Sequence, residues 1–157
     1  MTTHAPRIAL LEREVVTPET AVVYDALLAQ RGVIPNMFKV LAYNPAIAQS
    51  VAGLLKALLG DSALPGWYKE LVAVRISILN QSEYATRAHN ASARKKGATE
   101  GQIAGVANFE SGPYSPREKL GFRLADRLHR GASAVDDAFY AELKPAFSDA
   151  EPVSNIV

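Results

Sequence analysis

The chain has 157 residues, the usual length of one domain with a single hydrophobic core, and we expect one domain over residues 1–157. Hydrophobic residues make up 48% and charged residues 21%, while the net charge of +1 gives no sign of nucleic-acid binding. With no cysteine, the chain has no disulfide, no thiol nucleophile and no thiolate-bound metal. No stretch is apolar enough for a signal peptide or for the roughly 18 residues of a membrane span, so we expect a cytoplasmic protein that does not contact membranes.

Helix signals dominate the chain and strand signals are nearly absent, so the sequence predicts an all-α fold, a compact bundle of seven or eight short helices. Residues 1–16 are expected to form a loose N-terminal arm, because the first helix signal is the cap and proline of Thr17-Pro18, opening a helix to about residue 30. Ser148 to Glu151 resembles a last capping box, before a short tail at residues 152–157. The other helices are expected at about residues 36–41 (or 43), 45–60, 67–79, 82–96, 99–107, 115–130 and 136–143.

The candidate catalytic residues lie between Glu70 and Gly97. Ser82, Ala85 and His89 are spaced i, i+3 and i+7, which places them on one face of a helix. Glu70 is one of few charges in the apolar segment before that helix, and burial raises the pKa of a carboxyl group unless the group is paired. We therefore expect Glu70 and His89 to form a proton-transfer pair in which each tunes the other toward neutral pH.

Structural roles explain the same residues without any reaction. Glu70 could instead form an ion pair with Arg75 or Arg94 and anchor the bundle, and Ser82 is a good N-cap residue. A single histidine on a helix is more often a packed or surface residue than a catalyst. No two histidines have metal-ligand spacing, and the chain has neither a glycine-rich phosphate loop nor a GxSxG elbow, so we expect no metal site and no cofactor.

Glu70, Ser82, Ala85 and His89 form the spaced frame E-(x)11-S-x-x-A-x-x-x-H, which continues into an alanine-rich stretch ending at Gly97. This frame closely resembles the signature of the alkylhydroperoxidase / carboxymuconolactone decarboxylase family, in which redox members have cysteine at the two middle positions. The flanking segments also resemble the family, so that the resemblance covers roughly residues 20 to 150. These flanking segments are residues 31–39, 44–45 and 97–100.

The resemblance implies an alkylhydroperoxidase-like fold that assembles as a homo-oligomer, either a trimer, a hexamer built from dimers, or a dimer. In redox members one thiol attacks a peroxide or accepts electrons while the His and Glu relay its proton, so the resemblance assigns this relay to His89 and Glu70. Ser82 and Ala85 cannot replace the thiols, because serine neither forms a disulfide nor reduces a peroxide. We therefore expect a family member that lacks the redox cysteines and has no thiol peroxidase activity.

The decarboxylase branch of the family does not depend on the thiol pair. By this resemblance we expect cofactor-free acid/base chemistry, of decarboxylation, lyase or isomerase type, on a small organic acid or lactone. The residues expected to act are Glu70, His89, Tyr84 and Ser82 as catalytic groups, with Arg75 and Arg87 holding the substrate carboxylate. The alternative is a catalytically inactive family member that serves as a binding or assembly subunit.

Overall fold

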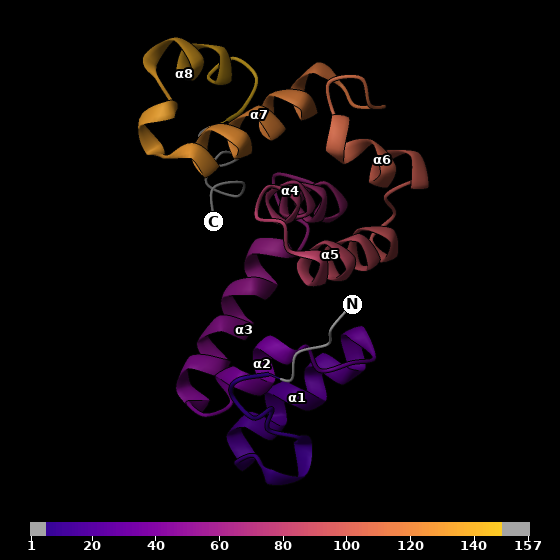
Figure 1. The fold of residues 1–157 in the computed structure, drawn as a ribbon, viewed down its shortest axis with the longest axis vertical. Coiled ribbons are helices and arrows are strands. Elements are labelled where there is room, and N and C mark those ends of the chain that lie inside the picture. Colours follow the sequence, from indigo (N-terminus) through magenta and orange to yellow (C-terminus); the bar gives the residue numbers. More distant parts are fainter. Residues whose placement is uncertain (1–5, 149–157) are drawn as a thin grey trace. The chain divides into compact units, whose positions relative to one another are not determined.

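The computed structural model describes residues 6–148, and in them it contains eight α-helices, three short 3₁₀ helices and no strand (Figure 1). The all-α fold expected from the sequence is confirmed. None of the helices in this range is both long and apolar enough to span a bilayer. The elements in chain order are η1 (Arg13–Val15), α1 (Pro18–Arg31), α2 (Asn36–Leu41), α3 (Pro45–Leu59), α4 (Gly66–Leu79), α5 (Glu83–Lys95), α6 (Glu100–Gly105), η2 (Val106–Asn108), α7 (Pro116–Arg130), η3 (Ala132–Ala134) and α8 (Asp137–Leu143).

Local capping residues set the ends of these helices. The Thr17 side chain accepts a hydrogen bond from the backbone N–H of Thr20 at the start of α1. Ser115 and Glu118 form a capping box at the start of α7. Gly97 follows α5 with a φ of +100°, in the left-handed region that favours glycine. Because such signals act within one turn, the expected helix ends agree with the observed ones to within about two residues.

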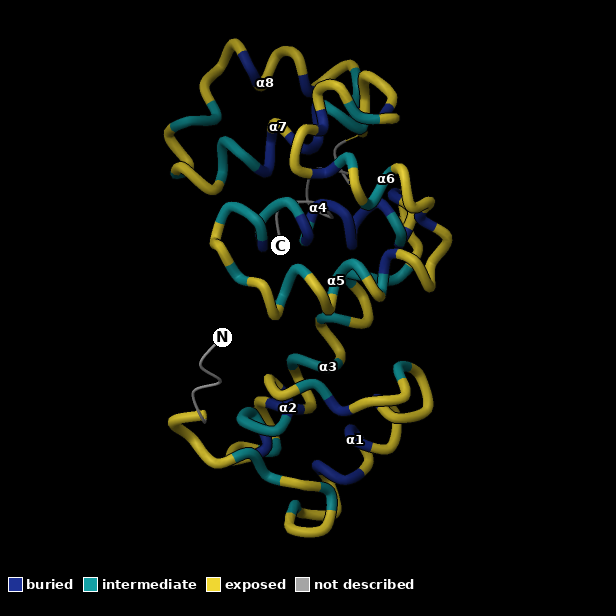
Figure 2. The backbone as a smooth tube through the Cα atoms, turned by 45° about the vertical axis from the view of Figure 1, so that its right-hand side comes forward, coloured by how far each residue is buried: buried dark blue, intermediate teal, exposed yellow. Residues whose placement is uncertain are grey.

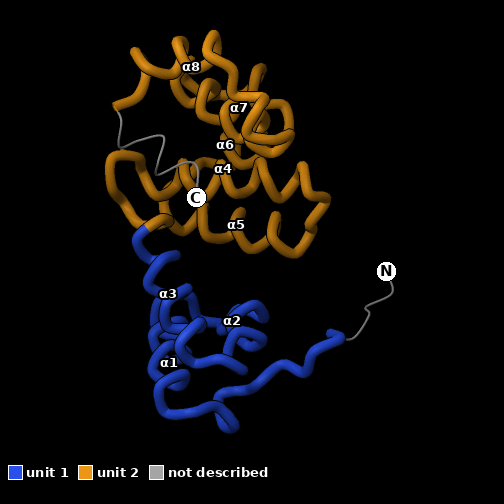
Figure 3. Tube along the Cα trace, turned by 90° about the vertical axis from the view of Figure 1, so that its left-hand side faces the viewer, with its two compact units in different colours: residues 1–57 blue, residues 58–157 orange. Residues whose placement is uncertain are grey.

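The chain divides into two compact units, Met1–Ala57 and Leu58–Val157 (Figure 3). The single domain expected from the length of the chain stays a prediction. The capping box expected at residues 148–151 and the tail expected at residues 152–157 fall almost entirely outside the described residues.

The first unit has its own small core, formed by α1, α2 and part of α3. Tyr24 and Phe38 are buried in it, and the Tyr24 hydroxyl donates a hydrogen bond of 2.9 Å to the Leu11 carbonyl. Arg13 forms a two-pronged ion pair with Asp25, with N–O distances of 2.7 and 2.9 Å. Residues 11 and 13 of the N-terminal arm thus contact the first unit, and the loose arm expected at residues 1–16 stays a prediction.

The second unit is built around α4, which packs against both α5 and α7 (Figure 1). Most residues of α4 are buried, as its apolar sequence predicts, whereas α5 buries only Ala93 (Figure 2). Phe122 on α7 lies in the centre of an aromatic cluster, with ring centroids 4.9 to 5.4 Å from those of Tyr68, Phe109 and Tyr114. The few charged side chains of α4 therefore lie between packed helices rather than in open solvent.

Candidate functional site

Glu70 on α4 is the centre of a charged cluster, and its side chain is completely buried. His89 Nδ1 lies 2.7 Å from Oε2 of this carboxylate. Ser92 Oγ donates to Oε1 at 2.7 Å, and Lys96 Nζ donates to the same oxygen at 2.5 Å. Three donors thus compensate a charge that would be very costly to bury alone.

The three donors come from one face of α5 and its C-terminal end. His89 and Ser92 are three residues apart, and Lys96 follows Ser92 by four, which are the spacings that align side chains on a helix. Lys96 is the C-cap residue and also donates to the Leu59 carbonyl at 2.5 Å. His89 therefore lies on one face of α5, as expected. Ser92 and Lys96 lie along the same face and also bind Glu70, and the sequence analysis did not predict these two partners. Their i+3 and i+7 spacing from His89 was the signal that could have found them.

Glu70 is ionised at neutral pH. Burial alone raises the pKa of its carboxyl group, but hydrogen bonds from His89, Lys96 and Ser92 and the positive charge of Lys96 outweigh burial and lower the pKa from 4.5 to about 2. The expectation that Glu70 is tuned toward neutral pH is therefore wrong. The physical reason is that the sequence reveals the burial of the carboxylate but not the three donors gathered on it.

His89 is held in one orientation by this carboxylate. An ionised carboxylate only accepts hydrogen bonds, so Nδ1 of His89 must carry the proton that it shares with Glu70. The imidazole is 30% exposed, and within residues 6–148 no partner is recorded for its Nε2. Such a pair fixes the tautomer and leaves Nε2 as the nitrogen that can take up and return a proton.

The other two residues expected to be catalytic lie near the start of α5. Ser82 is the N-cap of the helix, and its Oγ accepts a 3.4 Å hydrogen bond from the backbone N–H of Ala85. It lies about two helical turns, or about 10 Å, before His89 on the same face. Tyr84 is half exposed, and its position five residues before His89 turns it about 140° away around the helix. A catalytic role for Ser82 or Tyr84 stays a prediction.

Arg75, expected to hold a substrate carboxylate, has protein partners of its own. It lies five residues after Glu70, so it points about 140° away around α4. Its Nε and Nη2 donate to the two carboxylate oxygens of Asp126 on α7, at 2.6 and 2.8 Å, and its Nη1 donates to the Ala107 carbonyl at 3.0 Å. The guanidinium also lies 5.1 Å from the ring centroid of Phe109. The structure therefore does not bring Arg75 together with the Glu70–His89 pair.

The remaining arginines of interest also bind acids of their own. Arg87 is exposed and lies 3.7 Å from Glu83 of the same helix. Arg94 forms a two-pronged pair with Glu100, at 2.5 and 2.9 Å. The structural alternative expected an ion pair between Glu70 and Arg75 or Arg94, and neither pair forms. Glu70 does join α4 to α5, but through other side chains.

Metal ligands do not gather around this cluster. Among residues 6–148, no group of three or more His, Asp or Glu side chains is close enough to hold a metal ion. The expected absence of a metal and of a cofactor stays a prediction.

Comparison with solved structures supports the fold. A peroxidase-related protein with an alkylhydroperoxidase AhpD core, from Ralstonia eutropha JMP134, matches with a TM-score of 0.85 and 22% identity, over 98% of this chain and 83% of that chain. A peroxidase-related protein from Silicibacter sp. TM1040 matches with a TM-score of 0.81 and 20% identity, over 99% and 84%. The debrominase Bmp8, of which a variant is known in complex with 2,3,4-tribromopyrrole, matches with a TM-score of 0.83 and 18% identity, over 96% and 81%.

Sequence comparison identifies the family. Comparison with curated protein sequences finds no match. The sequence model of the Carboxymuconolactone decarboxylase family matches residues 45–127, which is more than half of the chain and includes both Glu70 and His89. With this match, and with the AhpD-like fold around a frame that has no cysteine, the chain belongs to the carboxymuconolactone decarboxylase family as a member without the redox thiols.

Proposed function

We propose that the protein is a cofactor-independent enzyme that performs acid/base chemistry, of decarboxylation, lyase or isomerase type, on a small organic acid or lactone. The observation that carries the proposal is the 2.7 Å contact between His89 Nδ1 and the buried, ionised carboxylate of Glu70. A histidine oriented in this way is an effective general base and acid. The absence of cysteine removes every reaction that needs a thiol.

In this reaction His89 exchanges the proton and Glu70 positions it. Nε2 of the neutral imidazole removes a proton from a carbon beside the substrate carbonyl, and the electron pair of the broken C–H bond forms an enolate. The imidazolium, held in place by Glu70, then returns the proton to a different carbon, which completes an isomerisation. In a decarboxylation, the C–C bond to the carboxylate breaks, carbon dioxide leaves, and the electron pair of that bond forms an enolate. Protonated His89 then supplies a proton to this enolate. Ser82, on the same face of α5 as His89, is a candidate donor to the substrate, whereas Tyr84 and Arg87 lie on other faces of the helix and would reach only a substrate that extends around it.

The test is turnover of a panel of lactones and aromatic-derived acids by the wild-type protein and by two histidine variants. We expect His89→Ala to lower kcat by about 10² to 10⁴, the usual contribution of a general base. His129→Ala is the matched control, because His129 is an exposed histidine near the end of α7, and its turnover should equal that of the wild type. Equal turnover by His89→Ala and the wild type would exclude the proposal.

A second candidate function is an inactive family member that serves as a binding or assembly subunit. The observation that favours it is the number of structural bonds in the same cluster, because Lys96 joins Glu70 to the Leu59 carbonyl and Ser92 occupies the second bond to Oε1. This candidate predicts no turnover on any member of the panel by the wild type. It also predicts that Glu70→Gln changes the mass of the homo-oligomer, trimer, hexamer or dimer, measured by sedimentation equilibrium.

A further inference from the structure

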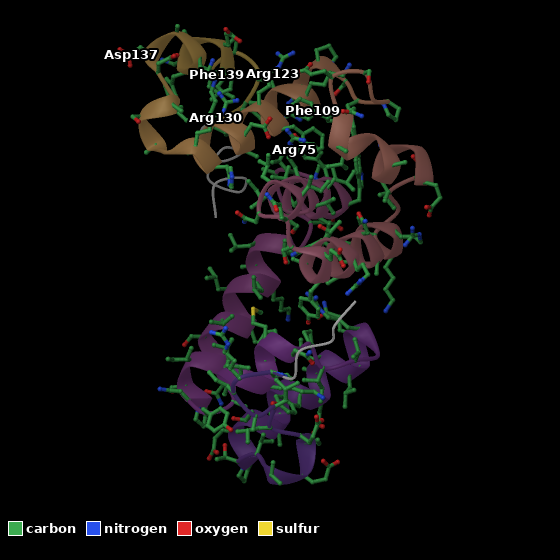
Figure 4. The ribbon with its side chains drawn as sticks, in the orientation of Figure 1. Arg75, Phe109, Arg123, Arg130, Asp137 and Phe139 are labelled. Atoms are coloured by element: carbon green, nitrogen blue, oxygen red, sulfur yellow. The ribbon has the colours of Figure 1, made fainter. Side chains whose placement is uncertain are left out.

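A second charged centre of the Leu58–Val157 unit is a cleft of about 620 Å³ lined by four arginines. They are Arg75 of α4 and Arg123, Arg127 and Arg130 of α7, and Figure 4 labels Arg75, Arg123 and Arg130 in the region where α4, α7 and α8 meet. Neither Glu70 nor His89 lines this cleft. It is therefore a feature separate from the proposed acid/base site.

The arginines of α7 are arranged as a stripe. Arg123, Arg127 and Arg130 are spaced i, i+4 and i+7, which places all three on one face of the helix. Arg75 reaches the same face from α4 through its two-pronged pair with Asp126. Four guanidinium groups therefore converge on one cleft, although like charges repel when they are brought together.

Hydrogen-bond donors outnumber acceptors in this cleft. Each guanidinium has five N–H donors, and Arg123 uses only Nε and Nη2, which donate to Glu110 at 2.6 and 2.8 Å. Arg127 uses Nη1, which donates to the Ala134 carbonyl at 2.8 Å and to Asp136 at 3.2 Å. For Arg130, no hydrogen bond or ion pair is recorded with any residue in the range 6–148. The N–H groups that remain are available to an acceptor-rich partner.

Two of the three acids of the lining are already bound by arginines. Asp126 is bound in both its oxygens by Arg75, and Glu110 is bound in both by Arg123. Glu142 is the third carboxylate of the lining, and its charge acts on Arg123. The Arg123–Glu110 pair is about half exposed, so it contributes little to stability and a ligand carboxylate or phosphate can replace Glu110 in it.

Two aromatic rings fix the guanidinium planes before any ligand arrives. The Arg127 guanidinium lies 4.1 Å from the ring centroid of Phe139, and that of Arg75 lies 5.1 Å from the centroid of Phe109. Both rings line the cleft. Because these side chains are already ordered, binding an anion costs less conformational entropy than binding it between free arginines.

We propose that this cleft binds a small, multiply charged oxyanion, either a polycarboxylate or a phosphate-bearing molecule. Arg130 and the free N–H groups of Arg123 and Arg127 donate to the anion, and Arg75 holds the less exposed end of the cleft through Asp126. The site is independent of the chemistry at His89, since neither Glu70 nor His89 lines the cleft.

The test is isothermal titration of the full chain with citrate, inorganic phosphate and acetate at constant ionic strength. We expect saturable binding of citrate or phosphate and none of acetate, because one carboxylate cannot engage several guanidinium groups. Tighter binding of citrate identifies a polycarboxylate ligand, and tighter binding of phosphate identifies a phosphate-bearing one. We expect Arg130→Gln, which removes no recorded ion pair, to weaken binding by at least about tenfold.

Arg13→Gln is the matched control for Arg123→Gln. Both arginines form two-pronged, half-exposed pairs with one acid, but Arg13 lies in the other unit, with Asp25. We expect Arg123→Gln to weaken anion binding by several-fold and Arg13→Gln to leave it unchanged, while circular dichroism confirms that each variant is folded. The proposal is overturned if neither citrate nor phosphate saturates, if acetate binds as tightly, or if Arg130→Gln binds like the wild type.

Discussion

The two charged centres of the Leu58–Val157 unit both begin on α4, and they differ in their balance of donors and acceptors. In the first, one buried carboxylate, that of Glu70, receives hydrogen bonds from three side chains. In the second, four guanidinium groups lie among four carboxylates, those of Glu110, Asp126, Asp136 and Glu142, and some of their N–H groups have no recorded partner among residues 6–148. A buried charge whose partners satisfy it stabilises the fold, whereas a cluster of charges with unused donors is available to a ligand.

Glu70→Gln should give the largest loss of stability in this comparison. The amide keeps the shape of the side chain but removes the charge that holds His89 and Lys96, and it places an NH₂ group where a donor already points. We expect the free energy of unfolding to fall by roughly 3 kcal/mol. This is the free energy that corresponds to lowering the pKa of the carboxyl group from 4.5 to about 2. Urea unfolding at neutral pH measures this loss, and a loss below about 1 kcal/mol would show that the three donors around Glu70 do not stabilise the fold.

The same stabilisation should disappear in acid. The carboxyl group of Glu70 has a lower pKa in the folded chain, about 2, than its ordinary value of 4.5 in the unfolded chain, so the unfolded chain binds the proton more readily. The contribution of Glu70 is therefore complete above pH 4.5 and is lost as the pH falls from 4.5 toward 2. Unfolding curves of the wild type and Glu70→Gln over this range should converge at the acid end. Parallel curves would show that the carboxylate is not stabilised as the structure indicates.

Arg75→Gln should have an intermediate effect. Arg75 and Asp126 have side chains only 14% and 16% exposed, so the variant leaves a poorly solvated carboxylate without its cation. We expect a loss of about 2 kcal/mol, less than for the completely buried Glu70. Asp126→Asn should cost a similar amount, because it breaks the same pair from the other side. A loss as large as that of Glu70→Gln would show that the arginine cleft is also mainly structural.

Arg123→Gln should have the smallest effect on stability. Its pair with Glu110 is exposed at 45% and 54%, and such pairs contribute less than about 1 kcal/mol. Arg13→Gln, whose pair with Asp25 is exposed at 41% and 57%, should cost the same. Thermal unfolding of the two variants side by side checks this equality. A larger loss for Arg123→Gln alone would assign this arginine to the fold rather than to ligand binding.

The helices could be predicted from the sequence because their signals are local. The cap at Thr17, the capping box of Ser115 and Glu118 and the glycine at Gly97 each act within one turn, and each lies where the structure ends or begins a helix. The approach of Glu70 to His89 could also be predicted, from the apolar segment around Glu70 and the helical position of His89 and from the resemblance to a family frame.

The partners across helices could not be predicted in the same way. Arg75 and Asp126 are 51 residues apart, and their pairing depends on how α4 packs against α7, which no local period specifies. Lys96 escaped notice because lysines at the end of a helix are usually solvated, and here it bonds to buried Glu70 and to the Leu59 carbonyl. The lowered pKa of Glu70 depends on Lys96 and Ser92, which the sequence analysis did not identify as donors. The burial of the carboxylate could therefore be predicted, but the hydrogen bonds that offset the cost of burying its charge could not.

The hydrogen bond at the start of α5 affects what a thiol at position 82 would do. At the position where redox relatives have a cysteine, the Ser82 hydroxyl accepts the backbone N–H of Ala85. Serine is among the best N-cap residues and typically stabilises a helix by about 1 kcal/mol over alanine, whereas a thiol is only a weak acceptor. With serine here, the start of α5 has a side-chain cap that cysteine would provide only weakly. Ser82→Cys would therefore add a thiol on the face of His89 at the cost of a weaker helix start.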